Sequence, residues 1–520
     1  MNIYAFEAER PVIQTKAGLL RGMCFGGVEI FLGVKYGTAK RFQMAQEIEP
    51  WEGIKNCYAF GATAMQMRQF SGRSFAFPFE RGSSFSAPQS EDCLHLNVWA
   101  PKRDGSKKPV FVYMHGGGFF QGASTESTTF DGFTLAHEEG TVVVTMNHRL
   151  NLMGHLNLAD YGEEFKYSKN VGIFDLVLCL KWIHENIAAF GGDPDNVTLC
   201  GHSGGGGKVL SMYQIEEAKD YFARGICMSG VLDNGPETGE EDSRKMAKAI
   251  CDELGITKET KDKLYEVPFE DILAAYRKVT PQLIAAGINI NMAPLKDDIF
   301  MGFPVQEGGF AAWSKDKPLM LCTVFGEFNE KVSIPDEVKE TITEQGKLDM
   351  LRERFGARYM ELVELFQKTY PTHDILDLMY LDSGFRVPST QTAHIKASQS
   401  KEDNTYMYLF AANMPVNGWI PAWHGCDVAY MFLNADRIPG ENPPIYGEQY
   451  CKAFRGMVLG FTKNGDPNSD ALPAWKPFTT DHHYTMVLDK KCELKEAFDE
   501  ELLKLYMELC PVFNFNPITR

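Results

Sequence analysis

Short apolar runs that end in glycine or polar residues recur along the chain and predict the strands of a sheet. Residues 109–114, 141–146 and 319–325 are almost continuously apolar, which is typical of strands buried on both faces. Three runs alternate between apolar and polar residues, at 16–22, 28–34 and 93–99, and the first two are predicted to form a short antiparallel start. Further strands are predicted at 197–200, 225–229 and 405–410.

Between these runs, apolar residues recur at helical spacing. Residues 172–189 carry apolar side chains every three or four positions, and two further helices are predicted near the C-terminus, at 450–461 and 502–509. Strands therefore alternate with helices, which favours an α/β fold with a large, mostly parallel central sheet flanked by helices. The 520 residues contain no Pro/Ser-rich linker, low-complexity tract or repeat, so we expect one domain over residues 1–520.

The run at 197–200 ends abruptly in glycines around one serine, in the sequence Gly201-His202-Ser203-Gly204-Gly205. This G-x-S-x-G pattern predicts a sharp strand-to-helix turn, because glycines avoid collisions with the neighbouring strand and helix. Such a turn raises the Ser203 hydroxyl above the sheet and aims the Gly204 amide at a developing negative charge, which suits acyl transfer. Taken alone, the pattern also fits a glycine-rich turn that holds an incidental serine.

A second glycine-rich segment follows the strand at 109–114, in the sequence His115-Gly116-Gly117-Gly118-Phe119. Three glycines at the end of a buried strand let the backbone approach a ligand and turn its amides inward. An acyl-transfer site needs such amides to stabilise an oxyanion. The alternative is a plain glycine turn.

Composition and charge narrow the classes of partner. Against 52 Lys and Arg stand 69 Asp and Glu, which gives a net charge of −17, so we expect neither nucleic acid nor an anionic membrane surface as a partner. The first ten residues lack the basic start and apolar core of a signal peptide, and no apolar run is long enough to span a bilayer, so we expect a cytoplasmic location. The 12 cysteines are scattered without CxxC pairs, as buried reduced thiols are, and no metal site is predicted.

Longer blocks match one protein family over nearly the whole chain: SEDCLHLNV at 90–98, NHRL at 147–150, ENIAAFGGDP at 185–194, GHSGG at 201–205 and NGDPN at 464–468. With these blocks the chain resembles the type-B carboxylesterases, the branch of the α/β-hydrolase superfamily that includes the cholinesterases. The resemblance implies an α/β-hydrolase fold with loop and helical insertions over the active site. It also implies a serine esterase that acts on small-molecule esters and requires no metal or organic cofactor.

Carried onto matching positions, the resemblance implies a Ser–acid–His triad with Ser203 as nucleophile, Glu327 as acid and His424 as base. The oxyanion amides that it implies are those of Gly117, Gly118 and Gly204. Chemistry requires the same residue types, because a serine hydroxyl is a weak nucleophile until a histidine takes its proton. A buried carboxylate must in turn hold that imidazole in the correct tautomer.

Chain order alone leaves other bases open. The competing histidines are His373, His394, His482 and His483. None of them follows a predicted central strand, and the last two are predicted to lie in a solvated loop. Ser229, in the family's position behind the acid, is expected to support Glu327 by a hydrogen bond, with a satisfied strand serine as the alternative.

The chain departs from the family pattern near the site. His202 stands where glutamate is usual, and Gly204 stands where alanine is usual, a change that leaves amide donation intact. Phe328 replaces the glycine after the acid, and a second carboxylate, Glu330, lies three residues beyond Glu327. No earlier cysteine stands where the family's first disulfide needs one, so we expect Cys93 to be a free thiol.

We therefore expect a serine carboxylesterase that forms an acyl-enzyme and hydrolyses small to medium, apolar or aromatic esters. The expected preference rests on residues 67–89, which resemble the loop at the mouth of the family's active-site gorge and hold phenylalanines at 70, 75, 77, 79 and 85. Alternatively, these rings only pack the loop onto the protein. Two other functions on the same scaffold stay open, a lyase or eliminase and a non-catalytic adhesion protein.

Overall fold

The computed structural model describes residues 7–66, 88–231, 239–328, 334–416 and 418–510. The five phenylalanines of the expected gorge loop and the second carboxylate, Glu330, lie outside the described residues. The predictions that rest on these residues stay predictions.

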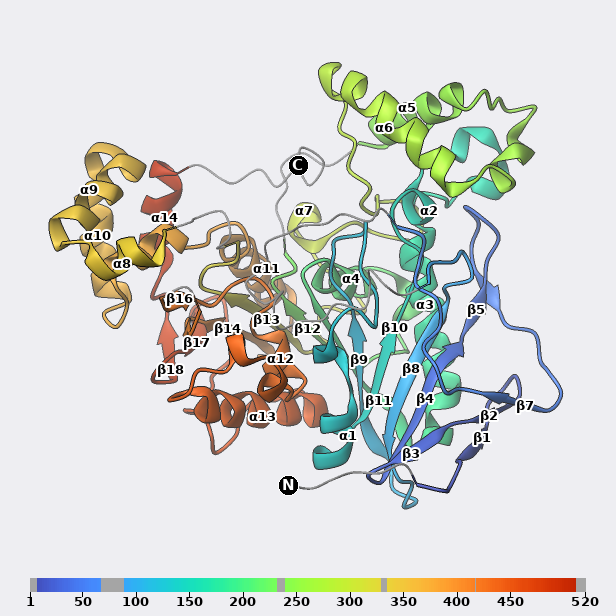
Figure 1. The fold of residues 1–520 in the computed structure, drawn as a ribbon, viewed down its shortest axis with the longest axis horizontal. Helices are drawn as coiled ribbons and strands as arrows, with labels where there is room; N and C mark the ends of the chain where they lie inside the picture. The colour runs from blue at the N-terminus through green and yellow to red at the C-terminus, as the bar shows by residue number, and fades with distance from the viewer. Residues whose placement is uncertain (1–6, 67–87, 232–238, 329–333, 417, 511–520) are drawn as a thin grey trace.

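A large sheet runs through the molecule, and in the described residues it has 11 strands in the order β18-β17-β14-β13-β12-β11-β9-β10-β8-β4-β3 (Figure 1). From β17 to β10 each strand pairs in parallel with its neighbour, whereas β18, β8, β4 and β3 pair antiparallel. The predicted large, mostly parallel sheet is therefore confirmed. The strands are β3 (Met23–Phe25), β4 (Val28–Lys35), β8 (His95–Pro101), β9 (Lys108–Met114), β10 (Val142–Met146), β11 (Gly192–His202), β12 (Arg224–Met228), β13 (Leu319–Val324), β14 (Thr405–Phe410), β17 (Tyr484–Leu488) and β18 (Glu493–Glu496).

Two parts of the sheet differ from the prediction. The expected antiparallel start is divided: β4 joins the main sheet, while β2 (Leu19–Arg21) pairs with β1 (Val12–Gln14) and β7 (Ile54–Asn56) in a separate small sheet. The chain passes between the two sheets at Gly22, where an added Cβ would lie 2.5 Å from the Ile30 carbonyl oxygen. At the other end of the sheet, β17 and β18 follow the predicted solvated loop at His482 and His483. The sequence does not predict these two strands, because they are short and directly adjoin that loop.

Alternate residues of the central strands point to opposite faces and build two cores. On β9, Phe111 and Tyr113 join a cluster with α1 (Phe133–Glu139) and α13 (Gly447–Asn464). The intervening Val110, Val112 and Met114 join a second cluster, with α3 (Val171–Asn186) and α4 (Gly204–Met212). Helices therefore cover both faces of the sheet, as continuous apolar strands require.

Helical insertions lie at two ends of the molecule (Figure 1). One insertion comprises α2 (Asn151–His155), α5 (Glu240–Glu253) and α6 (Phe269–Ala285), which share a third core. The other comprises α9 (Glu344–Phe355), α10 (Tyr359–Thr369) and α14 (Glu500–Leu509), whose apolar residues extend the first core. Only α14 is predicted individually by the sequence.

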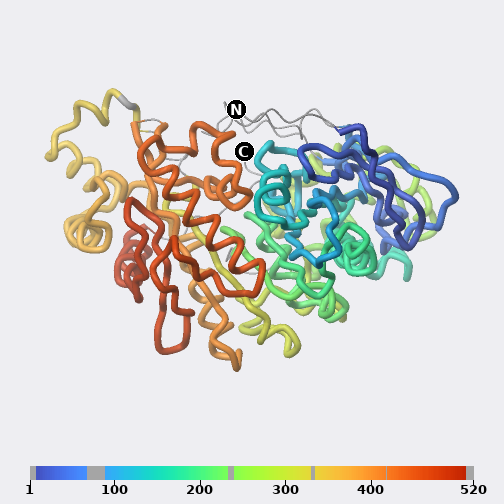
Figure 2. Tube along the Cα trace, turned by 90° about the horizontal axis from the view of Figure 1, so that it is seen from below, coloured from blue at the N-terminus to red at the C-terminus, as the bar shows by residue number. Residues whose placement is uncertain are grey.

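The chain runs from one side of the molecule to the other, with the N-terminal part (blue to cyan) and the C-terminal part (orange to red) on opposite sides in Figure 2. No helix within the described residues combines the length and the apolar character that crossing a bilayer requires. All 12 cysteines lie in the described residues as free thiols, and Cys93 is among those that are buried, as predicted.

Candidate active site

The predicted strand-to-helix turn at Ser203 is present. β11 ends at His202, α4 begins at Gly204, and Ser203 between them has φ 58° and ψ −127°, a conformation that non-glycine residues rarely adopt. The turn is held by the Ser203 N–H, which donates to the Met228 carbonyl at 2.8 Å. Glycine is required beside it, because a Cβ on Gly205 would lie 2.0 Å from the Met114 carbonyl oxygen.

The second glycine-rich segment meets this turn. Gly117 and Gly118 have φ of 79° and 61°, values that favour glycine. A Cβ on Gly204 would lie 2.2 Å from the Gly118 carbonyl oxygen, and one on Gly116 would lie 3.4 Å from the Ser203 Cβ. The structure therefore brings the backbone of the glycine loop, the start of α4 and the candidate nucleophile together.

The candidate acid and base are joined in a hydrogen-bonded chain. The His424 Nδ1 lies 2.5 Å from the Glu327 Oε2, and the His424 N–H donates to the Glu327 carbonyl at 2.6 Å. On the other side of the carboxylate, the Ser229 hydroxyl donates to Oε1 at 2.6 Å and the Val324 N–H donates to Oε1 at 3.2 Å. The predicted hydrogen bond from Ser229 to Glu327 is present.

Glu327 follows the carboxyl end of β13 and is fully buried. Burial raises the pKa of its carboxyl group to about 8, while the hydrogen bonds from Ser229 and the Val324 N–H lower it. A proton taken up by the Glu327–His424 pair therefore belongs to the pair rather than to one residue.

Two further carboxyl groups lie close enough to Glu327 for its charge to raise their pKa values, and sequence reasoning missed both. Burial and the charge of Glu327 raise the pKa of Asp382 to about 7. Asp427 has its pKa raised to about 7, mainly by burial, and accepts a hydrogen bond from the Tyr408 hydroxyl at 2.7 Å. Asp427 stands three residues after His424, and this short spacing could have indicated that Asp427 lies near the base. Asp382 is distant from His424 and Glu327 in sequence, and no motif around Asp382 indicates that it lies near them.

The competing histidines have other partners. Their ring nitrogens or ring faces contact groups away from Glu327: His373 Nδ1 with Asp377 at 2.9 Å, His482 Nδ1 with Glu496 at 2.7 Å, His483 Nδ1 with Glu500 at 2.6 Å, and the His394 ring with that of His483, the ring centroids 4.6 Å apart. Geometry therefore favours His424 over all four.

Three aromatic rings surround His424. The ring centroid of His202 lies 4.3 Å from that of His424, and those of Phe328 and Phe385 lie at 4.7 and 5.0 Å. Burial, together with the charge of His424, holds the pKa of His202 well below its usual range. Since His202 directly precedes Ser203, this contact places the nucleophile turn beside the candidate base. Phe385 was not predicted, because it lies far from the site in sequence.

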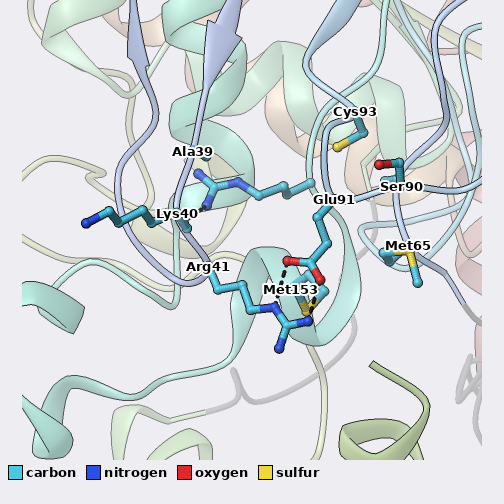
Figure 3. Close-up of a pocket in the computed structure, with 10 residues that line it drawn as sticks. Ala39, Lys40, Arg41, Met65, Ser90, Glu91, Cys93 and Met153 are labelled. Atoms are coloured by element: carbon cyan, nitrogen blue, oxygen red, sulfur yellow. Dashed lines mark hydrogen bonds and ion pairs between the residues drawn. The ribbon is translucent and has the colours of Figure 1, made fainter. Parts of the chain in front are cut away.

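Residues from two family blocks meet in a small pocket that none of Ser203, Glu327 and His424 lines (Figure 3). There Glu91 forms an ion pair with Arg41. Arg149, which also lines the pocket, forms a buried ion pair with Asp175, the Nη2 lying 2.6 Å from Oδ1. These residues form ion pairs between segments that are distant in sequence, and they do not form part of the candidate active site.

A family model described as the carboxylesterase family matches residues 9–505 of the chain. The chain belongs to the carboxylesterase family. Membership makes it a carboxylic ester hydrolase, and the expected α/β-hydrolase fold is that of its solved structural neighbours. An esterase from anaerobic Clostridium hathewayi, whose description says that it can hydrolyse aliphatic aromatic polyesters, has a TM-score of 0.91 and 37% sequence identity; the match covers 98% of this chain and 99% of that one.

Two curated relatives of this carboxylesterase are more distant. Para-nitrobenzyl esterase of Bacillus subtilis (strain 168) is 27% identical over 501 residues, which cover 94% of this chain and 97% of the relative. Phenmedipham hydrolase of Pseudarthrobacter oxydans is 27% identical over 504 residues, which cover 92% of this chain and 95% of the relative. Both matches span nearly the whole chain.

Proposed function

We propose that this carboxylesterase hydrolyses esters through an acyl-enzyme, with Ser203 as nucleophile, His424 as general base and Glu327 as the acid that orients it. The observation that carries the proposal is the hydrogen-bonded chain from Ser229 through Glu327 to His424, beside a serine held on a strained turn. The backbone amides of Gly117, Gly118 and Gly204 are the proposed oxyanion donors, since the loop and α4 meet there.

The proposed reaction has two halves. The Ser203 Oγ attacks the ester carbonyl carbon and gives its proton to the His424 Nε2, while Nδ1–H stays bonded to Glu327. The tetrahedral oxyanion collapses, His424 donates the proton to the leaving alcohol, and an acyl-Ser203 ester remains. Water, deprotonated by His424, then attacks this ester. The C–Oγ bond to Ser203 breaks, the Ser203 Oγ takes the proton back from His424, and the carboxylic acid is released.

The proposed substrates are small to medium esters with apolar or aromatic groups. Phe328 is half-buried beside the His424 ring, so an apolar surface lies next to the proposed base. The names of the relatives, which refer to a nitrobenzyl ester, to phenmedipham and to aliphatic aromatic polyesters, support the same preference. Diesters of an aromatic dicarboxylic acid with aliphatic alcohols are therefore the first substrates to test, and long-chain triglycerides are expected to react poorly.

The remaining expectations also stay proposals. We propose that residues 1–520 act as one catalytic unit, that it is cytoplasmic, and that its partner is the ester alone, with no cofactor. The net charge of −17 supports the exclusion of nucleic acid.

The test is intact-mass analysis after treatment with a fluorophosphonate serine probe, followed by burst kinetics with a para-nitrophenyl ester. We expect one adduct, mapped to Ser203, and a burst of about one nitrophenol per enzyme before steady state. Ser203→Ala is expected to abolish both. Turnover with neither a burst nor a serine adduct indicates lyase-type chemistry, and absence of both labelling and turnover in the unaltered protein indicates a binding protein; either result overturns the proposal.

A further inference from the structure

Lys208 is a lysine that the proposed mechanism does not use, and it is completely buried. It lies on α4, the helix that begins with Gly204, and none of its surface is exposed. Its Nζ donates a hydrogen bond to the His115 carbonyl at 2.8 Å and lies 5.7 Å from the centroid of the Phe119 ring. Because burying an ammonium group is costly, a lysine at such a position calls for a specific role.

The hydrogen bond joins the two pieces of backbone that carry the proposed oxyanion donors. Gly204 opens the helix that holds Lys208, and His115 opens the loop that holds Gly117 and Gly118. The loop itself depends on positive φ angles at both of these glycines, which give a backbone with little preference of its own for one conformation. A bond from α4 to the first carbonyl of the loop therefore sets how the loop meets the helix.

Three buried histidines, His115, His148 and His155, lie near enough to this lysine for its charge to add to the effect of burial in lowering the pKa of each. Each Nδ1 lies near a backbone carbonyl, that of His115 at 2.9 Å from the Gly116 oxygen, that of His148 at 2.8 Å from the Arg149 oxygen and that of His155 at 3.0 Å from the Lys169 oxygen. With Nδ1 protonated for these bonds, each Nε2 presents a lone pair, and all three Nε2 atoms are buried without a hydrogen-bond partner among the described residues. The three imidazoles therefore stay neutral, so they add no positive charge beside Lys208 and supply no negative charge to balance it.

We propose that Lys208 is a positioning residue that sets the orientation of the His115–Gly118 loop against Gly204, so that the three amides converge on one oxyanion. The inference rests on the proposed function, which assigns the oxyanion to these amides. Removal of one oxyanion donor from a serine hydrolase costs about a hundredfold to a thousandfold in kcat. A loop that is displaced without losing a donor should cost less, about tenfold to a hundredfold.

The test compares Lys208→Met with a matched control, Lys396→Met. Lys396 is also fully buried and also donates through Nζ to a backbone carbonyl, that of Lys315, but it lies on α11 (Arg386–Gln399). We expect Lys208→Met to lower kcat by about tenfold to a hundredfold with little change in KM, and to weaken a trifluoromethyl ketone, which forms an oxyanion on the serine, by the same factor. Lys396→Met is expected to change the melting temperature while leaving kcat per labelled serine and inhibitor affinity unchanged.

Lys208→Gln keeps an N–H donor without the charge, so its kcat and its inhibitor affinity should lie between those of the unaltered protein and of Lys208→Met. It replaces Lys208→Met in the comparison if that variant does not fold. If the Lys208 variants match Lys396→Met in kcat per labelled serine and in inhibitor affinity, the positioning role is wrong. Ser203→Ala is measured alongside. Turnover by Ser203→Ala overturns the proposed function itself, whereas an inactive Ser203→Ala with normal Lys208 variants overturns only the positioning role.

Discussion

The imidazole rings of His202 and His424 lie with their centroids 4.3 Å apart and their planes tilted by 51°. His202 occupies the position before the nucleophile, where the sequence pattern of the family favours glutamate. Burial and the field of His424 keep the pKa of His202 low, so His202 stays neutral when His424 takes up a proton. The proposed base therefore has a neutral neighbour where a carboxylate is usual.

The first prediction concerns substrate selection and follows from the absence of a carboxylate at position 202. His202→Glu should raise the preference for a cationic substrate, because a carboxylate near the nucleophile attracts a quaternary ammonium group. At a separation of a few ångströms this attraction contributes about 1–2 kcal/mol, or roughly tenfold in kcat/KM. The measurement is the ratio of kcat/KM for butyrylcholine to that for its neutral analogue, 3,3-dimethylbutyl butyrate. His202→Gln is the neutral control, and a ratio that is equal in the two variants would contradict the idea.

The second prediction concerns the hydrogen bond from Ser229 to Glu327. Because this bond lowers the pKa of the Glu327 carboxyl group, Ser229→Ala should raise it, and the acid limb of kcat/KM against pH should move to higher pH. Loss of a hydrogen bond to a charged group corresponds to about 1.5–3 kcal/mol, an upper limit of roughly one to two pH units.

The control is Ser314→Ala, since Ser314 is a buried serine whose hydroxyl donates to the Tyr213 carbonyl at 2.6 Å, away from the site. It should leave the acid limb in place. An acid limb that stays fixed in Ser229→Ala would show that the Ser229 hydroxyl does not affect the Glu327 carboxyl group.

Glu327→Gln should lower kcat by about ten-thousandfold, as loss of the orienting carboxylate does in other triads.

The sequence predicts most of the central sheet because β9 to β14 are compact apolar runs ended by glycine or polar residues. It also predicts the nucleophile turn, since Ser203 and its glycines are contiguous. It does not reveal the surroundings of Glu327, because Asp382 and Phe385 come from a distant segment and reach the site only through the packing of α11. The sequence does not predict the burial of Lys208 either, because a lysine on a helix is normally exposed to solvent and is buried only through tertiary packing.

The third prediction tests whether the family block at 147–150 is structural. Arg149 and Asp175 are both buried, and Arg149 also donates to the carbonyls of Lys40 and Gln43. Arg149→Met leaves the Asp175 carboxylate buried without its cation, so we expect a loss of about 3–5 kcal/mol in the free energy of unfolding. The readout is the urea midpoint together with the number of serines labelled by the probe.

Adding Asp175→Leu to Arg149→Met should recover part of the loss, because the uncompensated charge is then gone. The kcat per labelled serine should stay within about twofold in both variants. A large fall in kcat per labelled serine with unchanged stability would instead indicate that the pocket of Figure 3 contributes to the reaction.

The last prediction concerns how stability depends on pH through Lys208. Burial lowers the pKa of this lysine from 10.5 to about 7, and the charge of Glu126 only partly opposes the shift. The nearby histidines, His115, His148 and His155, offer no compensation, since burial holds the pKa of each of them below its usual range.

Between pH 7 and pH 10.5 the unfolded chain therefore binds one proton more at this residue than the folded chain does, and stability rises with pH by about 1.4 kcal/mol per unit. This contribution is fully present above pH 10.5, is lost as the pH falls to about 7, and is constant below that. Lys208→Met lacks the titrating group, so the free energy of unfolding of the unaltered protein minus that of the variant should increase steadily from pH 7 to pH 9.5. Lys396, present in both proteins, cancels in the difference. A difference that does not change over this range would mean that Lys208 keeps its charge in the folded protein, held by its acceptors despite complete burial.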